Sequence, residues 1–219
     1  LTHCDTSTGV QNPVKELGRI CSKHDVLLIL DAVSSLGGSQ LKTDEWNIDI
    51  CISASQKGLE APPGLSIISV SEKAWQVIDN TPDPCWYLNL KTWKKFADDL
   101  PDWHPYPVTM AVNNVLALRE SLKNILKEGI EKRLKRHEEN ALFLRKSLVN
   151  LGFNLLAEEN FRSNTITAVE KDSRYEVTDL IKYLKEKHSI QIAVGLGELE
   201  GKLFRIGHMG LGASYKMTL

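Results

Sequence analysis

The hydrophobic pattern of the chain alternates between continuous apolar runs and segments with helical spacing. Three apolar runs, VLLILDAV at 26–33, DICISAS at 49–55 and GLSIISVS at 64–71, show no strict alternation. Such runs are typical of strands that are covered on both faces, as in a parallel sheet. The segment at 13–24 begins with a proline, which suits the first turn of a helix, and its apolar residues recur at helical spacing. Helices between such strands predict an α/β layer architecture.

The middle of the chain predicts two long helices. Apolar residues step by three and four through 107–125, Gly129 interrupts the pattern, and a second helical pattern fills 130–151 before Gly152. A glycine directly after the last helical residue is a common C-terminal signal. His137 lies on the apolar stripe of the second helix, a position more typical of a core histidine than of a ligand.

The C-terminal third is predicted to form a small α/β unit of its own. FNLLA, TITAVE, VTDLIKYLKEKH, IQIAV and KLFRIGH follow one another as strand, strand, helix, strand and strand. We therefore expect a boundary near Gly129. Residues 1–128 would be part of a larger domain, and 129–219 a linking helix and a small domain that is incomplete at its end. KAWQVI at 73–78 predicts a short helix, whereas 79–107, rich in proline and tryptophan, gives no clear assignment.

Composition narrows the class of protein. The chain has 219 residues, of which 42% are hydrophobic and 25% charged, and its net charge is -1. These values are ordinary for a soluble globular protein and give no reason to expect a nucleic-acid or membrane partner. No apolar run approaches the roughly 20 residues of a membrane span, and no signal peptide is recognisable. The four cysteines lack metal-binding spacing, so we expect no metal and a cytoplasmic location.

Candidate chemistry lies in four short segments. They are HCDTSTG at 3–9, LILDAVSSLGG at 28–38, SASQKG at 53–58 and KLFRIGH at 202–208. Three of them place a polar group at the end of an apolar strand, and open parallel sheets bind ligands at the carboxyl ends of their strands. The pattern therefore predicts that Asp31, Lys57 and the hydroxyl cluster at 6–8 converge on one crevice.

Asp31 and Lys57 have two possible interpretations. A carboxylate at a buried strand end is costly unless it meets a cation or hydrogen-bond donors, so the two side chains could form a structural ion pair. Alternatively, a cofactor could lie between them. Pyridoxal phosphate has a ring nitrogen that a carboxylate keeps protonated and an aldehyde that condenses with a lysine amine. The pattern alone leaves both interpretations open.

The segments HCDTSTGV, LILDAVSSLGG, SASQKGLEAPPG and LFRIGHMG, in this order, resemble the class V aminotransferases of pyridoxal-phosphate fold type I. The resemblance covers nearly the whole chain and is strongest to the alanine–glyoxylate and serine–pyruvate branch. It implies a mostly parallel large domain, of which only the C-terminal part is present here, and a small α/β domain. It also implies that a preceding segment of the native protein supplies an aromatic residue over the cofactor ring and a phosphate-binding turn.

The resemblance assigns cofactor roles to five residues. Lys57 corresponds to the lysine that forms the Schiff base and then shuttles a proton between substrate and cofactor. Asp31 corresponds to the partner of the pyridine nitrogen. Val33, expected on the same side of the strand, corresponds to the apolar residue under the ring. Gln56 corresponds to a phosphate ligand. Thr6 corresponds to a hydroxyl near the phenolic oxygen or the phosphate, although a hydroxyl that only stabilises the turn is equally consistent.

Three further residues have implied roles in binding. Arg205 corresponds to the arginine that clamps the substrate carboxylate, a task suited to the planar fork of guanidinium. Tyr106 and Thr109 lie in a segment that resembles the one reaching the cofactor phosphate of the neighbouring subunit. The resemblance therefore implies a homodimer with shared active sites. The loop VGLGELEGK does not open a helix after a first strand, so we do not expect a dinucleotide site.

The resemblance predicts a ping-pong transaminase. Alanine or serine would donate the amino group, and glyoxylate or pyruvate would accept it. Ureidoglycine–glyoxylate transamination would share the same motifs. A lyase or cysteine desulfurase of the same fold is a further alternative, with Cys85 as a weak candidate nucleophile. An inactive scaffold is disfavoured because Lys57, Asp31, Gln56 and Arg205 are all present.

Overall fold

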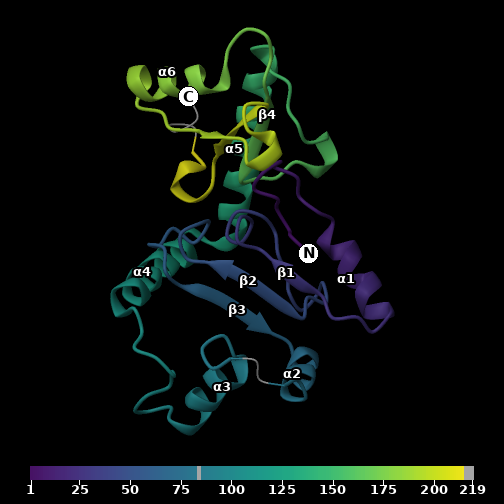
Figure 1. Cartoon of the computed structure of the whole chain (residues 1–219), viewed down its shortest axis with the longest axis vertical. Coiled ribbons are helices and arrows are strands. Elements are labelled where there is room, and N and C mark those ends of the chain that lie inside the picture. The colour runs from purple at the N-terminus through teal and green to yellow at the C-terminus, as the bar shows by residue number, and fades with distance from the viewer. Residues whose placement is uncertain (83–84, 215–219) are drawn as a thin grey trace.

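The computed structural model describes residues 1–82 and 85–214. Two three-stranded sheets form separate parts of the fold (Figure 1). Helix α4, Val112–Glu128, lies beside the first sheet, and helix α5, Ile130–Asn150, continues from it toward the second sheet. The two helices meet at Gly129, whose φ of 86° lies in the left-handed region that favours glycine. The predicted helix break is confirmed, and the domain boundary at this position stays a prediction.

The first sheet has the order β1-β2-β3, with β1 at Ile29–Asp31, β2 at Ile50–Ala54 and β3 at Ser66–Val70. β1 and β2 are parallel, as the continuous apolar runs predicted. β3 is antiparallel to β2, and there the expectation of a third parallel strand was wrong. The two strands are joined by a short loop that is closed where the Leu65 carbonyl accepts the Ser55 N–H at 3.1 Å. So short a connection can join neighbouring strands only in antiparallel fashion, because a parallel pair needs a long crossover.

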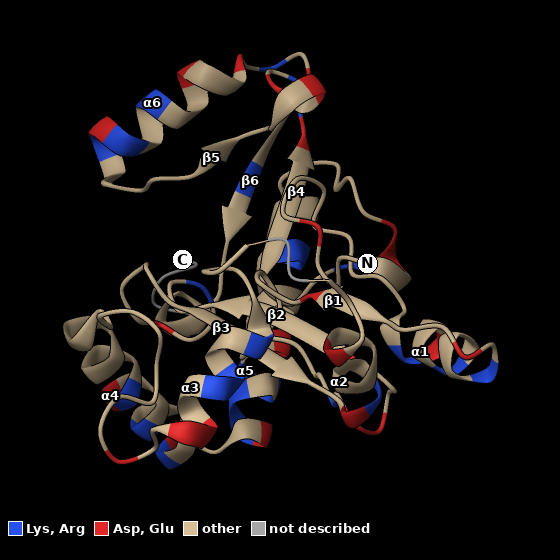
Figure 2. Ribbon diagram, turned by 60° about the horizontal axis from the view of Figure 1, so that its bottom comes forward, with Lys and Arg blue, Asp and Glu red and all other residues tan. Residues whose placement is uncertain are grey.

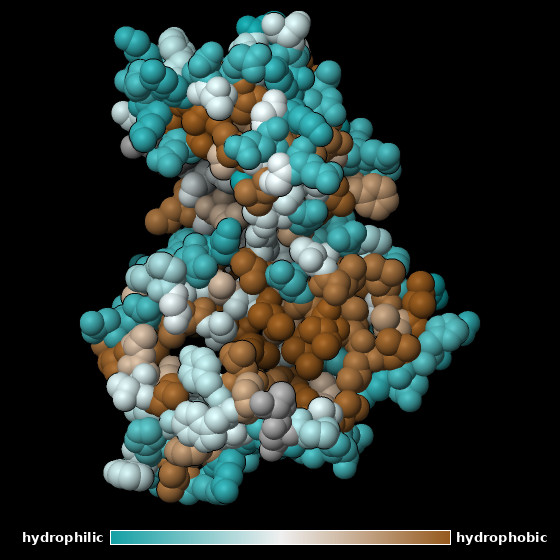
Figure 3. Space-filling model, in the orientation of Figure 1, coloured by the Kyte–Doolittle hydropathy of each residue, from teal (hydrophilic) through white to brown (hydrophobic). Residues whose placement is uncertain are grey.

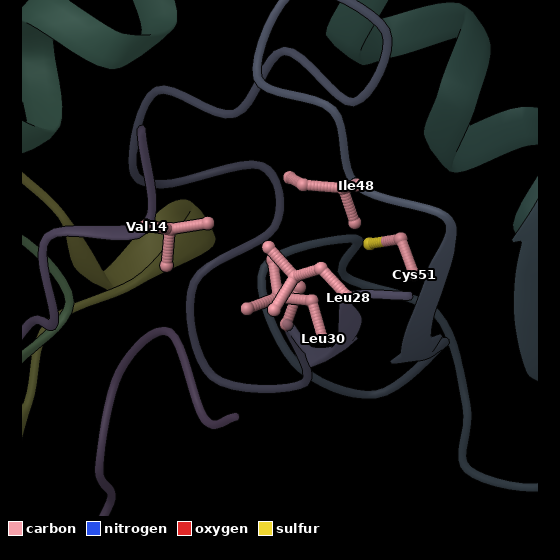
Figure 4. Close-up of a cluster of buried hydrophobic side chains, with 6 residues drawn as sticks. Val14, Leu28, Leu30, Ile48 and Cys51 are labelled. Carbon is pink, nitrogen blue, oxygen red and sulfur yellow. The ribbon is translucent and has the colours of Figure 1, made fainter. Parts of the chain in front are cut away.

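The core of the first sheet lies on one face only. Helix α1, Val14–Lys23, covers this face, and the buried cluster consists of Val14, Leu28, Leu30, Ala32, Ile48 and Cys51 (Figure 4). Ile29 and Asp31 alternate with the buried Leu30 and are exposed. Apolar side chains gather over this sheet in the space-filling view (Figure 3). The expectation that this apolar run is covered on both faces is therefore not met within the described chain.

Two short helices follow the first sheet. Helix α2, Glu72–Asp79, agrees with the predicted helix, and the Ser71 hydroxyl caps its first turn by accepting the Ala74 N–H. Helix α3, Leu90–Asp99, lies in the segment whose hydrophobic pattern predicted no clear element. Asn89 is its N-cap residue and accepts the Lys91 N–H through its side chain.

The second sheet has the order β4-β6-β5 and is antiparallel throughout. β4 is Ile166–Glu170, β5 is Ala193–Val194 and β6 is Leu203–Gly207. Helix α6, Val177–His188, packs with α5 on this sheet around Leu144, Leu148, Val169, Val177 and Phe204. The FNLLA segment makes only an isolated bridge, between Leu155 and Val169, rather than the strand expected there. Single 3-10 turns occupy Glu159–Phe161, Gly197–Leu199 and Gly210–Gly212.

His137 is a core residue, as its place on the apolar stripe predicted. Its side chain is fully buried in α5, and Nε2 accepts the Gly210 N–H at 2.9 Å. Nδ1 then carries the proton and donates to the Arg133 carbonyl at 2.8 Å. Burial lowers the pKa of His137, in keeping with this neutral state. Across residues 1–82 and 85–214, no helix is long and apolar enough to cross a bilayer.

Candidate active site

Three parallel segments of the chain end at the same edge of the first sheet. Residues 1–3 run beside β1, with a parallel bridge between Thr2 and Asp31, and β1 runs beside β2. Thr6 follows the first segment, Asp31 ends the second, and Lys57 follows the third. The predicted convergence of these three positions is therefore present in the topology. It arises because neighbouring parallel strands present their carboxyl ends at one edge.

The Asp31 carboxylate is fixed by its own backbone. Its Oδ1 accepts the Val33 N–H at 2.8 Å, in an aspartate turn that begins where β1 ends. The side chain is exposed on the open face of the sheet, and Val33 is half-buried. The prediction that Val33 points to the same side as Asp31 assumed an extended strand through both residues. Because β1 ends at Asp31, the alternation of a strand does not apply to Val33.

Lys57 lies in a tight turn after β2. The Lys57 carbonyl accepts the Glu60 N–H at 3.0 Å, and Glu60 has a φ of 59°. The buried Ser55 hydroxyl donates to the Pro62 carbonyl at 2.6 Å and anchors the start of the turn. Lys57 is half-buried, whereas Gln56 is exposed.

The Lys57 amine forms no hydrogen bond or ion pair with any described side chain, and no Asp31–Lys57 ion pair exists. The structural ion-pair interpretation is therefore wrong. A lysine in a rigid turn whose amine is unpaired can react with a ligand that enters the crevice.

Thr6 connects the N-terminal loop to the turn after Asp31. Its hydroxyl shares a 2.6 Å hydrogen bond with the hydroxyl of Ser34, which is buried. Turn stabilisation in this loop comes from other groups, since Asp5 accepts the Ser7 N–H and Thr8 accepts the Val10 N–H. The Thr6 hydroxyl therefore links two loops rather than closing its own turn, and its role at the cofactor stays a prediction.

Arg205 lies in the middle of β6, the central strand of the second sheet, and is only 9% exposed. In Figure 2, β6 is uncharged apart from this one basic position. Its Nε donates to the Val194 carbonyl at 2.8 Å, and one terminal nitrogen donates to the Thr6 carbonyl at 2.9 Å. Burial lowers the pKa of Arg205, and the negative charge of Asp5 partly offsets this effect. In the described chain, no carboxylate is paired with this guanidinium.

A buried chain of hydroxyls behind Thr6 was missed by sequence reasoning. The Thr165 hydroxyl donates to the Ser34 carbonyl at 2.6 Å and bonds the Ser163 hydroxyl at 2.9 Å. Cys4 donates to Ser163 at 2.9 Å, and burial raises the pKa of its thiol. The chain joins the two sheets beside the candidate site. The paired serines of DAVSS were a visible signal, whereas Ser163 and Thr165 had none.

Tyr106 and Thr109 are not brought to this edge by any described contact. The Tyr106 ring packs against His104, with ring centroids 4.7 Å apart, and Thr109 is exposed. Neither residue has a described hydrogen bond to the residues around Lys57. Their role at a neighbouring subunit's site stays a prediction.

Comparison with known proteins shows the family. The profile described as "Aminotransferase class-V" matches residues 1–199, and the chain belongs to this family. An uncharacterised aminotransferase of Methanocaldococcus jannaschii is 44% identical over 212 residues, which cover 96% of this chain and 54% of the relative. The crystal structure of an alanine–glyoxylate aminotransferase from Nostoc superposes with a TM-score of 0.92 at 33% identity, over 100% of this chain and 58% of that one.

A further structure, the ureidoglycine–glyoxylate aminotransferase of Bacillus subtilis, gives a TM-score of 0.89 at 32% identity, over 99% of this chain and 56% of that one. The chain thus spans about half the length of the proteins it matches. These likenesses confirm the expected pyridoxal-phosphate fold type I, with a mixed first sheet and an antiparallel second sheet in the described part.

Family membership implies pyridoxal 5′-phosphate as the cofactor. The residues at the sheet edge fit it. An unpaired amine suits an aldehyde, a carboxylate free of cations suits a ring nitrogen, and hydroxyl and amide groups suit polar oxygens. Lys57, Asp31, Thr6 and Gln56 supply these groups.

Proposed function

We propose that the protein is a pyridoxal-phosphate aminotransferase that moves an amino group from a small amino acid, alanine or serine, to a small 2-oxo acid, glyoxylate or pyruvate. The observation that carries the proposal is the edge of the first sheet. Asp31 ends β1 there, the unpaired Lys57 follows the neighbouring parallel strand β2, and the Arg205 guanidinium donates to the Thr6 carbonyl at the same edge.

Lys57 is the proposed catalytic residue. Pyridoxal phosphate, when bound, supplies an electron sink for the bond that breaks at the substrate α carbon. The Lys57 Nζ would hold the cofactor through its aldehyde and, when freed by the substrate amine, would carry a proton between the substrate α carbon and the cofactor carbon. The turn from Lys57 to Glu60 keeps the backbone of this base fixed.

Asp31 is the proposed partner of the ring nitrogen. The Val33 N–H holds one carboxylate oxygen, so the other oxygen is left to accept a ligand proton. Val33 is the proposed apolar contact below the ring, and Gln56 and Thr6 are proposed to bind polar oxygens of the cofactor. The exposure of Asp31 and Gln56 is consistent with groups that await a ligand or further protein.

Arg205 is the proposed binding group for the substrate carboxylate. Its guanidinium is buried and lacks a carboxylate partner, so an incoming carboxylate supplies the missing counter-charge. Both substrates carry one carboxylate and can use this arginine in turn. Use of one site by both substrates gives ping-pong kinetics.

The homodimer is part of the proposal. Tyr106 and Thr109 lie in an aromatic, partly exposed segment that contacts none of the other candidate residues through a described hydrogen bond. A role for them at the cofactor phosphate therefore requires a second subunit. Loss of cofactor affinity in a Y106F T109A variant, with Lys57 intact, is the expected sign of this sharing.

Ureidoglycine–glyoxylate transamination is the second candidate reaction, because the Bacillus subtilis enzyme of that name matches at a TM-score of 0.89. A cysteine desulfurase is less well supported. Cys85 is exposed, and Gln56 rather than a histidine precedes Lys57. An inactive scaffold is disfavoured by the unpaired amine of Lys57.

The full-length protein, loaded with pyridoxal phosphate, would be mixed with glyoxylate and a panel of amino donors: alanine, serine, aspartate and ureidoglycine. The proposal expects glycine formation with alanine or serine, and a loss of about 10³-fold or more in Lys57→Ala. Fastest turnover with ureidoglycine would favour the second candidate. No glycine from any donor, or full activity of the Lys57 variant, would contradict the proposed function.

A further inference from the structure

Arg133 lies fully inside the protein, in the first turn of α5, and is 1% exposed. Its guanidinium makes four hydrogen bonds. Nε donates to the Gly37 carbonyl at 2.7 Å, and one terminal nitrogen donates to the Gly58 carbonyl at 2.7 Å and to Glu60 at 2.6 Å. The other terminal nitrogen donates to Glu128 at 3.2 Å.

The two carbonyls belong to the turns that carry the proposed cofactor residues. Gly58 directly follows Lys57, and Gly37 lies in the turn that follows Asp31. These turns touch backbone to backbone. A Cβ atom on Gly58 would lie 2.2 Å from the Leu36 carbonyl oxygen, and one on Gly37 would lie 2.8 Å from the Gly58 oxygen. Arg133 therefore binds the two turns at the point where their glycine backbones are in direct contact.

Glu60 provides a second contact between Arg133 and the Lys57 turn. It has a left-handed backbone, with a φ of 59°, a conformation that is strained for a residue other than glycine. Its carboxylate is 15% exposed and pairs with Arg133 at 2.6 Å. The ion pair thus holds in place the strained residue that closes the turn with the Lys57 carbonyl.

We propose that Arg133 is a positioning residue for Lys57. By bridging the carbonyls of Gly37 and Gly58 with one planar fork, it sets the place of the Lys57 backbone relative to the strand end that carries Asp31. The kinetic part of this inference rests on the proposed function of Lys57. The structural part, the rigidity of the turn, does not.

Arg136 provides a matched control. It lies on the same helix, is also a partner of Glu128, and otherwise bonds the carbonyls of Gly210 and Ala213. It has no described contact with the Lys57 turn. Arg133→Gln and Arg136→Gln remove the same charge from neighbouring positions.

The first readout is backbone hydrogen exchange in the full-length protein without cofactor. Arg133→Gln is expected to speed exchange in peptides that cover 55–62 by about tenfold or more, since two anchors of the turn, at the Gly58 carbonyl and at Glu60, are lost. Arg133→Lys is expected to behave similarly, because an ammonium cannot bridge two carbonyls as a fork does. Arg136→Gln is expected to leave 55–62 unchanged. Equal exchange at 55–62 in the two glutamine variants would overturn the proposal.

The second readout is kinetic and uses the loaded enzyme. Arg133→Gln is expected to lower kcat by about 10- to 100-fold with little change in KM, because the base is misplaced while substrate contacts persist. The pH at which the cofactor absorbance changes is expected to shift as well. Faster exchange at 55–62 with normal kcat and an unshifted absorbance profile would contradict the proposal that Arg133 positions Lys57 for catalysis. Faster exchange in a protein that lacks transaminase activity altogether would instead fault the proposed function.

Glu60→Gln and Glu128→Gln serve if Arg133→Gln does not fold. Each removes one carboxylate partner of Arg133, but only Glu60 belongs to the Lys57 turn. Glu60→Gln is expected to speed exchange at 55–62 and lower kcat, whereas Glu128→Gln is expected to change neither. The reverse order of effects would contradict a positioning role.

Discussion

Two buried arginines show how the same side chain serves different purposes in the two sheets. Arg133, beside the first sheet, is 1% exposed and pairs with the carboxylates of Glu60 and Glu128. Arg205, in the second sheet, is 9% exposed and bonds only the backbone carbonyls of Thr6 and Val194. The difference in partners, rather than in burial, separates a structural cation from one that can bind a ligand.

The physical reason is the cost of a buried charge. A guanidinium surrounded by carboxylates is already neutralised, and removing it leaves unpaired charges in the protein. A guanidinium that bonds only neutral carbonyls has no carboxylate partner, and burial lowers the pKa of Arg205, an effect that the charge of Asp5 only partly offsets. A substrate carboxylate would therefore gain more from Arg205 than from Arg133.

Between the two arginines, the largest expected effect is kinetic and belongs to Arg205. Arg205→Ala is expected to lower kcat/KM for both substrates by about 100-fold or more, chiefly through KM, because the carboxylate loses a desolvated partner. Arg205→Lys should recover little, since an ammonium cannot replace the fork. Steady-state kinetics with donor and acceptor varied separately measure this. A KM within about twofold of wild type would remove Arg205 from the substrate site.

The next effect compares two glycines, one in each region. Gly58→Ala is expected to destabilise the protein by about 2–3 kcal/mol, because the new Cβ would meet the Leu36 carbonyl oxygen at 2.2 Å. Gly207→Ala, at the end of the strand that carries Arg205, meets nothing within 4 Å. It should change stability by less than about 1 kcal/mol. Urea unfolding of both variants tests the claim, and similar losses would contradict it.

The third effect is a pH dependence that differs between the regions. Burial, helped by the charge of Arg145, lowers the pKa of His208 from 6.5 to about 3. The folded state therefore keeps His208 neutral while the unfolded state takes up a proton. Stability is full above pH 6.5 and is lost as pH falls toward 3. At pH 5 the loss is about 2 kcal/mol.

His208→Gln should remove this part of the slope, measured as urea unfolding at pH 7.5 and pH 5. Beside Arg133, the pKa of Glu128 is instead lowered, mainly by the hydrogen bond from Arg136. Its contribution is present above its ordinary pKa of 4.5 and is lost only as pH falls below that value. The buried His3, whose pKa burial lowers to about 4, contributes in the same upper window, so an unchanged slope in His208→Gln would contradict only the part assigned to His208.

The smallest effect is expected at an exposed ion pair away from both arginines. Lys42 and Glu45 contact each other at 2.9 Å, but their side chains are 44% and 65% exposed. Lys42→Ala should change the free energy of unfolding by less than about 0.5 kcal/mol. A larger loss would mean that an ion pair stabilises this protein substantially even when it is exposed to solvent.

The candidate site residues near the ends of strands could be predicted from the sequence. Asp31 and Lys57 could be placed because apolar runs end at fixed positions, and neighbouring parallel strands share an edge. Gly129 could be placed because a helical pattern stops there. In each case, a local signal coincides with the feature that it predicts.

Arg133 could not be found in this way. It lies in the highly charged stretch EKRLKRHEE, where any basic residue is typical of a solvated helix face. Its partners Gly37 and Gly58 are 96 and 75 positions away in the chain, and carbonyl oxygens leave no trace in a sequence. The antiparallel β3 and helix α3 were missed for related reasons. The direction of β3 depends on how the loop after β2 closes, and the start of helix α3 depends on the single N-cap residue Asn89.

The most direct test of the account is to find the residue that holds the cofactor. The full-length protein would be loaded with pyridoxal phosphate, reduced with borohydride, digested and mapped by mass spectrometry. We expect the phosphopyridoxyl group on Lys57 alone, and no labelled peptide in Lys57→Ala. A label on another lysine of the wild-type protein, or the same labelling after Lys57 is replaced, would contradict the assignment of the site.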